Sequence, residues 1–214
     1  MNYDLIMAPR IVDKEQKRLA LIQAAVFIFA AKGFQSATMS EIAARAGVGK
    51  GTLYEYFHNK EDLFFAVFEW FGNSTFEQAQ QAVKDVNTAG DQLLALARAS
   101  IASMSEYREL FPLTLEFWAA SSAQITRERF ASALQSLYQS YRRTIALLVH
   151  AGQQHGEFRS SVDAEAVATM LVGAMDGLFL QHWFDPNLDP SAISEHFFEP
   201  LLRGLRNTDW EESL

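Results

Sequence analysis

The sequence predicts an all-α fold of about nine helices, with a three-helix domain followed by a larger helical domain. Apolar residues recur at steps of three or four along most of the chain, and no segment has the pattern of a strand. Two short helical segments joined by a glycine turn define the small domain. With 49% hydrophobic and 13% aromatic residues in 214, the rest of the chain can form a large core.

The first helix is expected to begin near Asp13, where Asp13 and Gln16 make a capping pair. Residues 1 to 12 carry no strong pattern, and we expect them to form a mobile arm. Lys32 and Gly33 place a cation in the last turn and a glycine after it. We expect this helix to complete a three-helix domain of residues 13–60. The apolar stripe of this first helix is Leu19, Ile22, Val26 and Phe29.

The second and third helices form a helix-turn-helix. Thr38 and Glu41 make a capping box, so a helix should begin at Met39. Gly47 supplies the left-handed residue that ends this helix. The next helix is expected to run from Gly49 or Lys50 to Phe57. In a unit of this kind the second helix lies in the DNA major groove.

The candidate DNA contacts are the residues left outside once Leu53 and Phe57 are assigned to the core. Lysine, threonine and tyrosine donate hydrogen bonds to phosphates and base edges, and glycine lets the main chain approach DNA closely. Each residue alone is better explained as part of an ordinary solvated helix, but the spacing of the whole set favours DNA binding. The candidates are Thr38, Gly49, Lys50, Gly51, Thr52, Tyr54, Tyr56 and Lys60.

The distribution of charge supports this assignment although the net charge is −8. Residues 10 to 60 hold eight Lys and Arg against four Asp and Glu, so the basic charge lies where DNA is expected. The chain has no cysteine, which suits a reducing cytoplasm. We find no apolar run of membrane-spanning length and no signal peptide, so a cytoplasmic location is expected.

The helix-turn-helix region is similar to that of a known family. The matching residues are Ala31-Lys-Gly-Phe34, Thr38, Ile42-Ala43, Ala46-Gly47-Val48, Lys50-Gly-Thr-Leu-Tyr54, Tyr56-Phe57 and Lys60-Glu-Asp-Leu63. On these residues the sequence resembles the TetR family of bacterial one-component transcriptional regulators over residues 14 to 65. Gly49 departs from the usual Ser or Thr, and Glu55 adds an acid to the recognition helix. Both departures concern the choice of operator.

The resemblance implies a ligand-responsive repressor that binds a palindromic operator as a dimer and leaves it when a small molecule binds. Its partners would be double-stranded DNA, an effector and a second copy of the chain, without a membrane. The rival interpretations are a helical ligand-binding interaction protein without DNA-binding activity and an unrecognised helical enzyme. The intact Lys50, Thr52 and Tyr54 count against the first of these.

Residues 61–214 are expected to form a ligand-binding and dimerisation domain. Asn59 should cap a fourth helix that runs towards residue 80, and the resemblance makes this helix the link between effector and DNA. We expect an interruption near Pro112 and a bend at Pro200. The later helices are expected at about 89–105, 107–121, 126–155, 163–184 and 189–206.

The helix at 163–184 is apolar nearly all round, which indicates burial against its own core and against a second chain. In the resembled family the last two helices form a four-helix bundle with those of the partner. A dimer also suits DNA, because one short helix reads too few bases. The predicted interface residues are Met170, Ala174, Leu178, Phe197, Leu201 and Leu205.

The aromatic content of the larger domain favours a cavity for an apolar or aromatic effector, although each residue alone is better explained as core. Among the polar residues that might orient an effector, Asp176 could select a cation or pair within the bundle. The others are Glu116, Gln124 and His182. The candidate lining residues are Phe64, Phe68, Phe117, Trp118, Tyr138, Tyr141, Met175 and Phe179.

Enzymatic function is not predicted. The segment Gly47-Val-Gly-Lys-Gly-Thr52 only superficially matches a phosphate-binding loop, because its leading glycine is absent and a helix precedes it. The five histidines lack the spacing of a metal site, and no serine or acid pair has a catalytic context. We therefore expect no cofactor and no metal.

Overall fold

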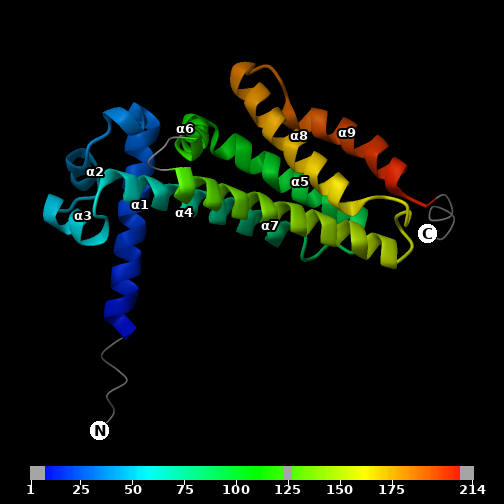
Figure 1. Ribbon diagram of the computed structural model, residues 1–214, viewed down its shortest axis with the longest axis horizontal. Helices are drawn as coiled ribbons and strands as arrows, with labels where there is room; N and C mark the ends of the chain where they lie inside the picture. Colours follow the sequence, from blue (N-terminus) through cyan, green and yellow to red (C-terminus); the bar gives the residue numbers. More distant parts are fainter. Residues whose placement is uncertain (1–7, 123–126, 208–214) are drawn as a thin grey trace, which may run out of the picture. The chain divides into compact units, whose positions relative to one another are not determined.

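The computed structural model describes residues 8–122 and 127–207, which form nine α-helices and one 3₁₀ turn (Figure 1). The one β-bridge within these ranges joins Phe158 and Arg206, so the all-α prediction is confirmed. The helices are α1 (Ala8–Ser36), α2 (Met39–Arg45), α3 (Lys50–Tyr56), α4 (Lys60–Ala82), α5 (Ala89–Glu106), α6 (Phe111–Ser122), α7 (Arg127–Gln154), α8 (Ala164–Phe184) and α9 (Pro190–Leu205), with the 3₁₀ turn at Arg108–Leu110.

Two compact units make up the chain. Unit 1 contains the residues up to Gly72 together with Glu109–Ala131, and unit 2 contains Asn73–Arg108 and the residues from Ser132 onwards. The beginning of α4 and the whole of α6 therefore belong with the helix-turn-helix, whereas the domain boundary expected from sequence lies at residue 60. The reason is packing, because α6 contacts α1 directly.

Helix α1 begins at Ala8, so residues 8–12, which were expected in a mobile arm, are helical. Residues 1–7 of that arm lie outside the described ranges. Pro9 suits a first turn, where its missing N–H is not needed, and Asp13 therefore lies inside the helix instead of capping it. The regular helix ends as predicted at Gly33, whose φ of 73° is one that glycine tolerates readily.

The buried face of α1 differs slightly from the predicted stripe. Leu21, Ile22 and Phe29 are at most 2% exposed, as is Ala25. Leu19, which was assigned to the core, is 39% exposed. The buried stripe therefore keeps Ile22 and Phe29 but is rotated about the helix axis towards Leu21 and Ala25.

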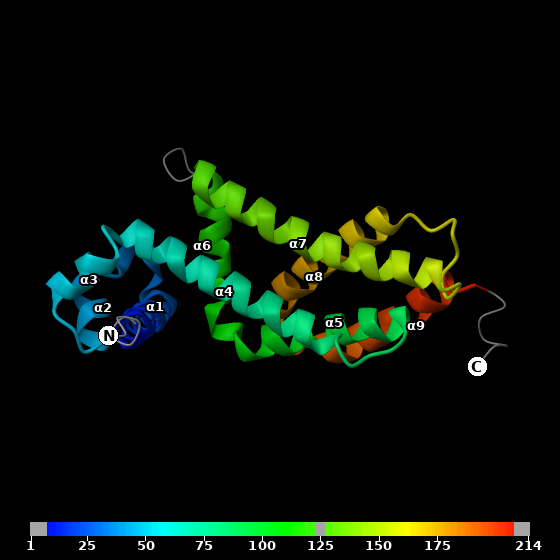
Figure 2. The same cartoon turned by 90° about the horizontal axis from the view of Figure 1, so that it is seen from below.

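The helix-turn-helix forms with the predicted caps. Thr38 caps α2 in a complete capping box with Glu41, and Gly47 has a φ of 69°. After this glycine, the N–H of Val48 donates to the carbonyl of Ala43, which closes the turn. Within unit 1, α2 lies beside both α1 and α3 (Figure 2). Its apolar residues and those of α3 pack inward, since Ile42, Ala43, Leu53 and Phe57 are at most 3% exposed.

Aromatic rings form the core of unit 1. The ring centroid of Phe64 on α4 lies 5.3 Å from that of Phe29 on α1 and 4.6 Å from that of Phe117 on α6. Contacts of this kind add to the burial of apolar surface. Pro112 is the second residue of α6, and the 3₁₀ turn Arg108–Leu110 just before this helix is the interruption that was expected near Pro112. The rings of this cluster include Phe29, Phe34, Phe64, Phe65, Phe68, Phe117 and Phe130.

In unit 2, α5, α7, α8 and α9 surround an apolar core that includes Leu93, Val149, Phe158 and Leu202. Glu157, only 2% exposed, accepts hydrogen bonds from the N–H groups of Ala89 (2.8 Å) and Gly90 (2.9 Å) at the beginning of α5. A carboxylate at a helix N-terminus satisfies donors that have no partner within the helix. Pro200 lies inside α9.

Gly152 of α7 lies against the ring of Phe158. A Cβ atom on Gly152 would be 2.3 Å from this ring and 2.9 Å from Cβ of Ala89. Gly152→Ala is therefore expected to lower the free energy of unfolding by about 1–3 kcal/mol, as overpacked cores do, despite the higher helix propensity of alanine. Urea unfolding measures the change. The control is Gly51→Ala, where a Cβ atom would meet nothing within 4 Å; equal stability of the two variants would contradict the prediction.

Among the described residues, two helices, Lys14–Ser36 and Ala164–Phe184, are long and apolar enough to span a membrane. This corrects the expectation that no apolar run approaches that length. The signal is weak, because core helices of soluble proteins and signal sequences pass the same test.

Candidate DNA-binding surface and effector cavity

The outer surface of α3 carries the predicted DNA contacts. Lys50 and Tyr54 are exposed and one turn apart, with the Lys50 Nζ atom 5.8 Å from the centroid of the Tyr54 ring. Thr52 and Tyr56 are half-buried. Leu53, which anchors this helix to the core, points the other way and is fully buried. Polar and aromatic groups are thus presented together on one short helix.

Glycines leave the beginning of α3 open. Gly49 is its N-terminal cap and makes no side-chain capping bond, as its departure from the usual Ser or Thr predicts. A Cβ atom on Gly49 or Gly51 would meet nothing within 4 Å. The main chain at both positions is therefore accessible to a large ligand such as DNA.

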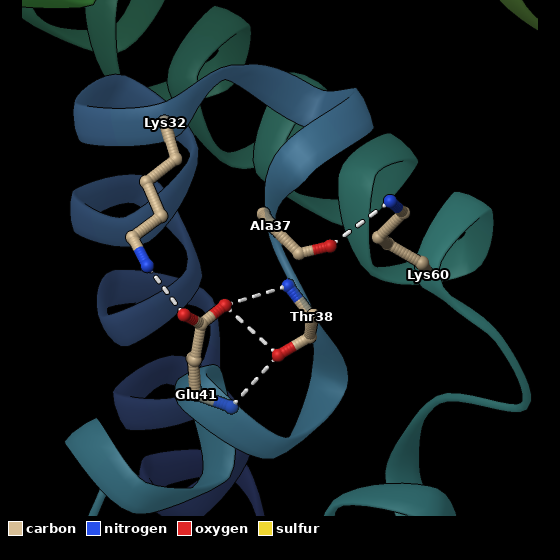
Figure 3. A network of polar contacts seen from close by, with 5 residues as sticks. All are labelled: Lys32, Ala37, Thr38, Glu41 and Lys60. Carbon is tan, nitrogen blue, oxygen red and sulfur yellow. Dashed lines mark hydrogen bonds and ion pairs between the residues drawn. The ribbon is translucent and has the colours of Figure 1, made fainter.

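Thr38, predicted to contact DNA, is used within the protein (Figure 3). Its Oγ1 atom accepts a hydrogen bond from the N–H of Glu41 (3.3 Å) and donates to Oε2 of the same residue (2.8 Å). Lys32 forms an ion pair with the other carboxylate oxygen of Glu41. The Lys32 hydrogen bond, followed by those from Thr38, lowers the pKa of Glu41. This network fixes the beginning of α2 against the end of α1.

Lys60 is also used within the protein. Its Nζ atom donates to the main-chain oxygens of Phe34, Gln35 and Ala37 at 2.7, 3.0 and 3.0 Å, the last of which is drawn in Figure 3. An ammonium group has three donors, so none remains for a DNA phosphate. In the segment 34–37 that Lys60 contacts, the N–H of Phe34 donates to both carboxylate oxygens of Glu116 on α6, at 3.1 and 2.9 Å. Lys60 and Glu116 therefore hold the α1–α2 connection in position.

The structure separates the predicted effector-binding residues into two groups. Phe64, Phe68 and Phe117 lie in the ring core of unit 1, where each is at most 6% exposed. The cavity that Phe117 lines has a volume of about 10 Å³, room for about one water molecule. Trp118 is half-buried in the same unit. The three phenylalanines are thus core residues, as the alternative interpretation held.

The other predicted effector residues, Tyr138, Tyr141, Met175 and Phe179, belong to unit 2. Met175 lines a cavity of about 40 Å³, which holds a few water molecules at most. Sequence reasoning did not predict this cavity, because aliphatic residues from four helices form most of its wall. Its lining is Leu93, Leu96, Ala97, Ser100, Ile145, Leu171, Val172, Met175 and Phe198.

Polar contacts adjoin this cavity wall. Asp176, next to Met175 on α8, is hydrogen-bonded to Tyr138 on α7. Burial raises the pKa of Asp176, and the Tyr138 hydrogen bond acts in the opposite direction. Burial likewise raises the pKa of Tyr141, which shares a hydrogen bond with Thr75 on α4.

The remaining polar candidates have other surroundings. His182 is hydrogen-bonded to the carbonyl of Leu188 in the connection to α9 (3.0 Å), and Gln124 lies outside the described residues. Within residues 8–122 and 127–207, no group of three His, Asp or Glu side chains is placed to hold a metal ion.

Several predicted interface residues are uncovered. Met170 is 72% exposed, Phe197 is 46% exposed and Ala174 is also exposed, whereas Leu178 and Leu201 are half-buried. Leu205 differs from the expectation, because it is 6% exposed and packs in the core of unit 2. On α9 the predicted interface residues Phe197, Leu201 and Leu205 are four residues apart, and each step of four turns about 40° beyond one helical turn. Leu205, the last of the three, therefore faces the core.

Comparison with known proteins places these features in a family. Residues 21–67 match the family model described as bacterial regulatory proteins of the tetR family, and residues 89–204 match that of the BetI-type transcriptional repressor, C-terminal. The chain therefore belongs to the TetR family of bacterial transcriptional regulators. It is a ligand-responsive, DNA-binding transcriptional repressor, and within the family its C-terminal part is of the BetI type.

Relatives match nearly the full length of the chain. The fatty acid metabolism regulator protein of Bacillus subtilis is 26% identical over 91% of this chain and 98% of its own length. The solved structure of FadR from Bacillus subtilis in complex with stearoyl-CoA covers 88% of this chain and 99% of its own, with 24% identity and a TM-score of 0.70. A putative regulator from Saccharomonospora viridis in complex with choline covers 90% and 99%, with 20% identity and a TM-score of 0.77. These two structures share the fold.

Proposed function

We propose that this repressor binds a palindromic operator as a homodimer, with α3 of each subunit in the major groove of one half-site. The observation that carries the proposal is α3 itself, a seven-residue helix with exposed Lys50 and Tyr54 beside open glycine main chain. So short a helix reaches only a few base pairs, and a two-fold dimer doubles the number that are read. Residues 13–60 would form the DNA-binding domain and residues 61–214 the ligand-binding and dimerisation domain, in a cytoplasmic protein.

The surface proposed to join the subunits is the exposed apolar face of α8 and α9. On α8, Met170 and Phe184 are 72% and 74% exposed, and a Cβ atom on Gly173 or Gly177 would meet nothing within 4 Å. On α9, Phe197 is 46% exposed. Large apolar side chains beside open glycines suit the close approach of a second pair of helices. The relevant face therefore centres on Met170, Gly173, Ala174, Gly177, Ile193, Phe197 and Gly204, with Leu178 and Leu201 at its edge.

We further propose that the effector is a small, largely apolar molecule bound in unit 2. The cavity lined by Met175 supports this location because its wall is almost entirely apolar. Its present volume of about 40 Å³ is too small for most effectors, so binding would have to move the helices around it. Stearoyl-CoA and choline, found in the two solved relatives, both carry apolar groups.

Helix α4 is the proposed route from effector to DNA. It runs without interruption from Lys60, which holds the α1–α2 connection, to Ala82, and it contributes Thr75 and Phe76 to unit 2. A ligand lowers DNA affinity only if it prefers a conformation that fits the operator poorly. A shift of the second half of α4 would reach the helix-turn-helix through Lys60.

Selection of genomic fragments by the purified full-length protein tests the proposed operator. The bound fragments should share a palindrome whose half-site centres lie about 34–36 Å apart, or a multiple of that distance. A screen for compounds that release these fragments then tests the switch. Fragments without two-fold symmetry would contradict dimeric reading of the operator.

Substitution of Lys50 and of Lys60 should have different effects on the salt dependence of operator binding. Lys50→Gln is expected to reduce the slope of log affinity against log salt concentration by about 1, because one phosphate contact is lost. Lys60→Gln should lower operator affinity without changing this slope, because the ammonium of Lys60 is bound to three carbonyls. Titrations between low and moderate salt measure both slopes. An equal loss of slope in the two variants would show that Lys60 meets a phosphate.

A further inference from the structure

The outermost positions of the recognition helix α3 are those of Gly51 and Glu55. Successive residues of an α-helix are rotated by about 100°, so these two positions lie about 160° and 200° from Leu53, the buried residue of α3. Both residues are exposed, and a Cβ atom on Gly51 would meet nothing within 4 Å. Lys50 and Tyr54 lie to one side of them on the helix. Glu55 therefore carries the side chain most directly opposite the core.

The carboxylate of Glu55 is not neutralised within the protein. No ion pair or hydrogen bond joins it to another of the residues that the structure describes. The carboxylate of Glu41 on α2, by contrast, is held by Lys32 and Thr38. Phosphates repel a free carboxylate on the side of α3 that faces DNA unless a hydrogen-bond donor in the groove meets it. The position of Glu55 thus indicates a donor on a base.

The four bases differ in what they offer to a carboxylate in the major groove. Cytosine presents the N4 amino group, which is a donor, whereas adenine presents its N6 amino group beside the acceptor N7. Guanine presents two acceptors, and thymine presents an acceptor and a methyl group. An ionised carboxylate accepts hydrogen bonds and donates none. It therefore matches cytosine, is less suited to adenine, and is repelled by guanine and thymine.

We propose that Glu55 is a specificity-determining residue for the operator. Its carboxylate accepts a hydrogen bond from the N4 amino group of one cytosine in each half-site and excludes guanine and thymine from that position. Gly51, one turn earlier on the same side of α3, leaves room for the helix to approach the base closely. The inference rests on the proposed function, because it names a base that the same recognition helix reads.

Selection from random-sequence DNA by the full-length protein tests the proposal. The palindrome selected by the wild type should contain cytosine at one fixed position of each half-site. Glu55→Gln should change that base to adenine, because a glutamine amide pairs with N6 and N7 of adenine, and Glu55→Ala should accept any base there. All other positions of the palindrome should stay the same. The control is Glu61→Gln, which removes an exposed acid at the beginning of α4 and should select the wild-type palindrome.

Removal of the amino group from the DNA provides the second arm. In the selected operator, the cytosine is replaced in both half-sites by 2-pyrimidinone, which lacks only the N4 amino group. The wild type should lose affinity by about tenfold or more, whereas Glu55→Ala should lose much less. Both operators carry the same phosphate charge, so the comparison reports the hydrogen bond and not the repulsion. An equal loss in the two proteins would contradict a contact between Glu55 and this group.

The same experiments separate this inference from the function on which it rests. One palindrome selected by the wild type and by both Glu55 variants would support dimeric reading of the operator and refute the role of Glu55. Variants that bind all DNA more tightly but select the same bases would show that Glu55 acts through repulsion alone, which also refutes it. A wild type that selects no palindrome would overturn the proposed function and this inference together.

Discussion

Replacing Lys50, Thr52, Tyr54 and Tyr56 together by alanine is expected to abolish specific operator binding and leave a folded dimer. Contacts to base edges contribute about 1–3 kcal/mol each, so losing several at once removes the 4–10 kcal/mol or so that separates specific from non-specific binding. The fold should survive, because the buried Leu53 of α3 is unchanged and alanine favours helices. Gel-shift titration measures binding, and circular dichroism with sedimentation confirms the fold.

The matched control for this variant is a set of exposed polar residues on α7, Gln135, Ser136 and Gln139, also replaced by alanine. It removes polar surface from a helix that has no proposed contact with DNA and should bind the operator normally. If the α3 variant also shifts the operator normally, the recognition helix has been assigned wrongly. If both variants lose binding, the loss reflects the folded state and not base contacts.

The helix-turn-helix was predictable because local rules determine it. The capping box needs only Thr38 and Glu41, and Gly33 and Gly47 take the positive φ angles expected of glycines that end helices. The cap at Asn59 is equally local, since its side chain accepts from the N–H of Asp62 at 2.7 Å. Each of these features depends on residues within one turn of each other, so the sequence pattern is sufficient.

The partners of long side chains were not predictable in the same way. Lys60 was expected to meet a phosphate, but its ammonium is bound to carbonyls 23 to 26 residues earlier. Glu116 was a candidate to orient an effector, but it accepts hydrogen bonds from a residue 82 positions away. Both side chains are polar and near the predicted site in sequence. Only the packing of α1, α4 and α6 shows that main-chain groups satisfy them.

Aromatic composition also proved ambiguous. Phe64 and Phe117 fill the core of unit 1, whereas Tyr138 and Tyr141 take part in polar contacts in unit 2. All four were candidates because they are aromatic, and aromatic content alone does not distinguish a filled core from the edge of a cavity. The cavity is lined mainly by leucine, isoleucine, valine and alanine, residues that every helical core contains.

A charge on the exposed face of α9 is expected to separate the subunits. Phe197→Glu would place a carboxylate from each subunit in an apolar contact near the two-fold axis, at a cost of about 3–5 kcal/mol for each uncompensated charge. Even one such charge raises the dissociation constant by about two to four orders of magnitude. Sedimentation velocity at micromolar concentration should therefore show a dimer for the wild type and a monomer for the variant, which should no longer bind the operator specifically.

The exposure of Phe197 is what makes this experiment decisive. Because its side chain is 46% exposed in a single chain, Glu at this position should leave the fold of the monomer intact. The same change at Leu205, which is 6% exposed, would bury a charge in the core of unit 2 and unfold it, so a loss of dimers there would be uninformative. Gln135→Glu, on an exposed face of α7, controls for the added charge and should remain a dimer. A wild-type protein that sediments as a monomer, or a Phe197→Glu variant that remains a dimer, would show that this face of α8 and α9 does not join the subunits.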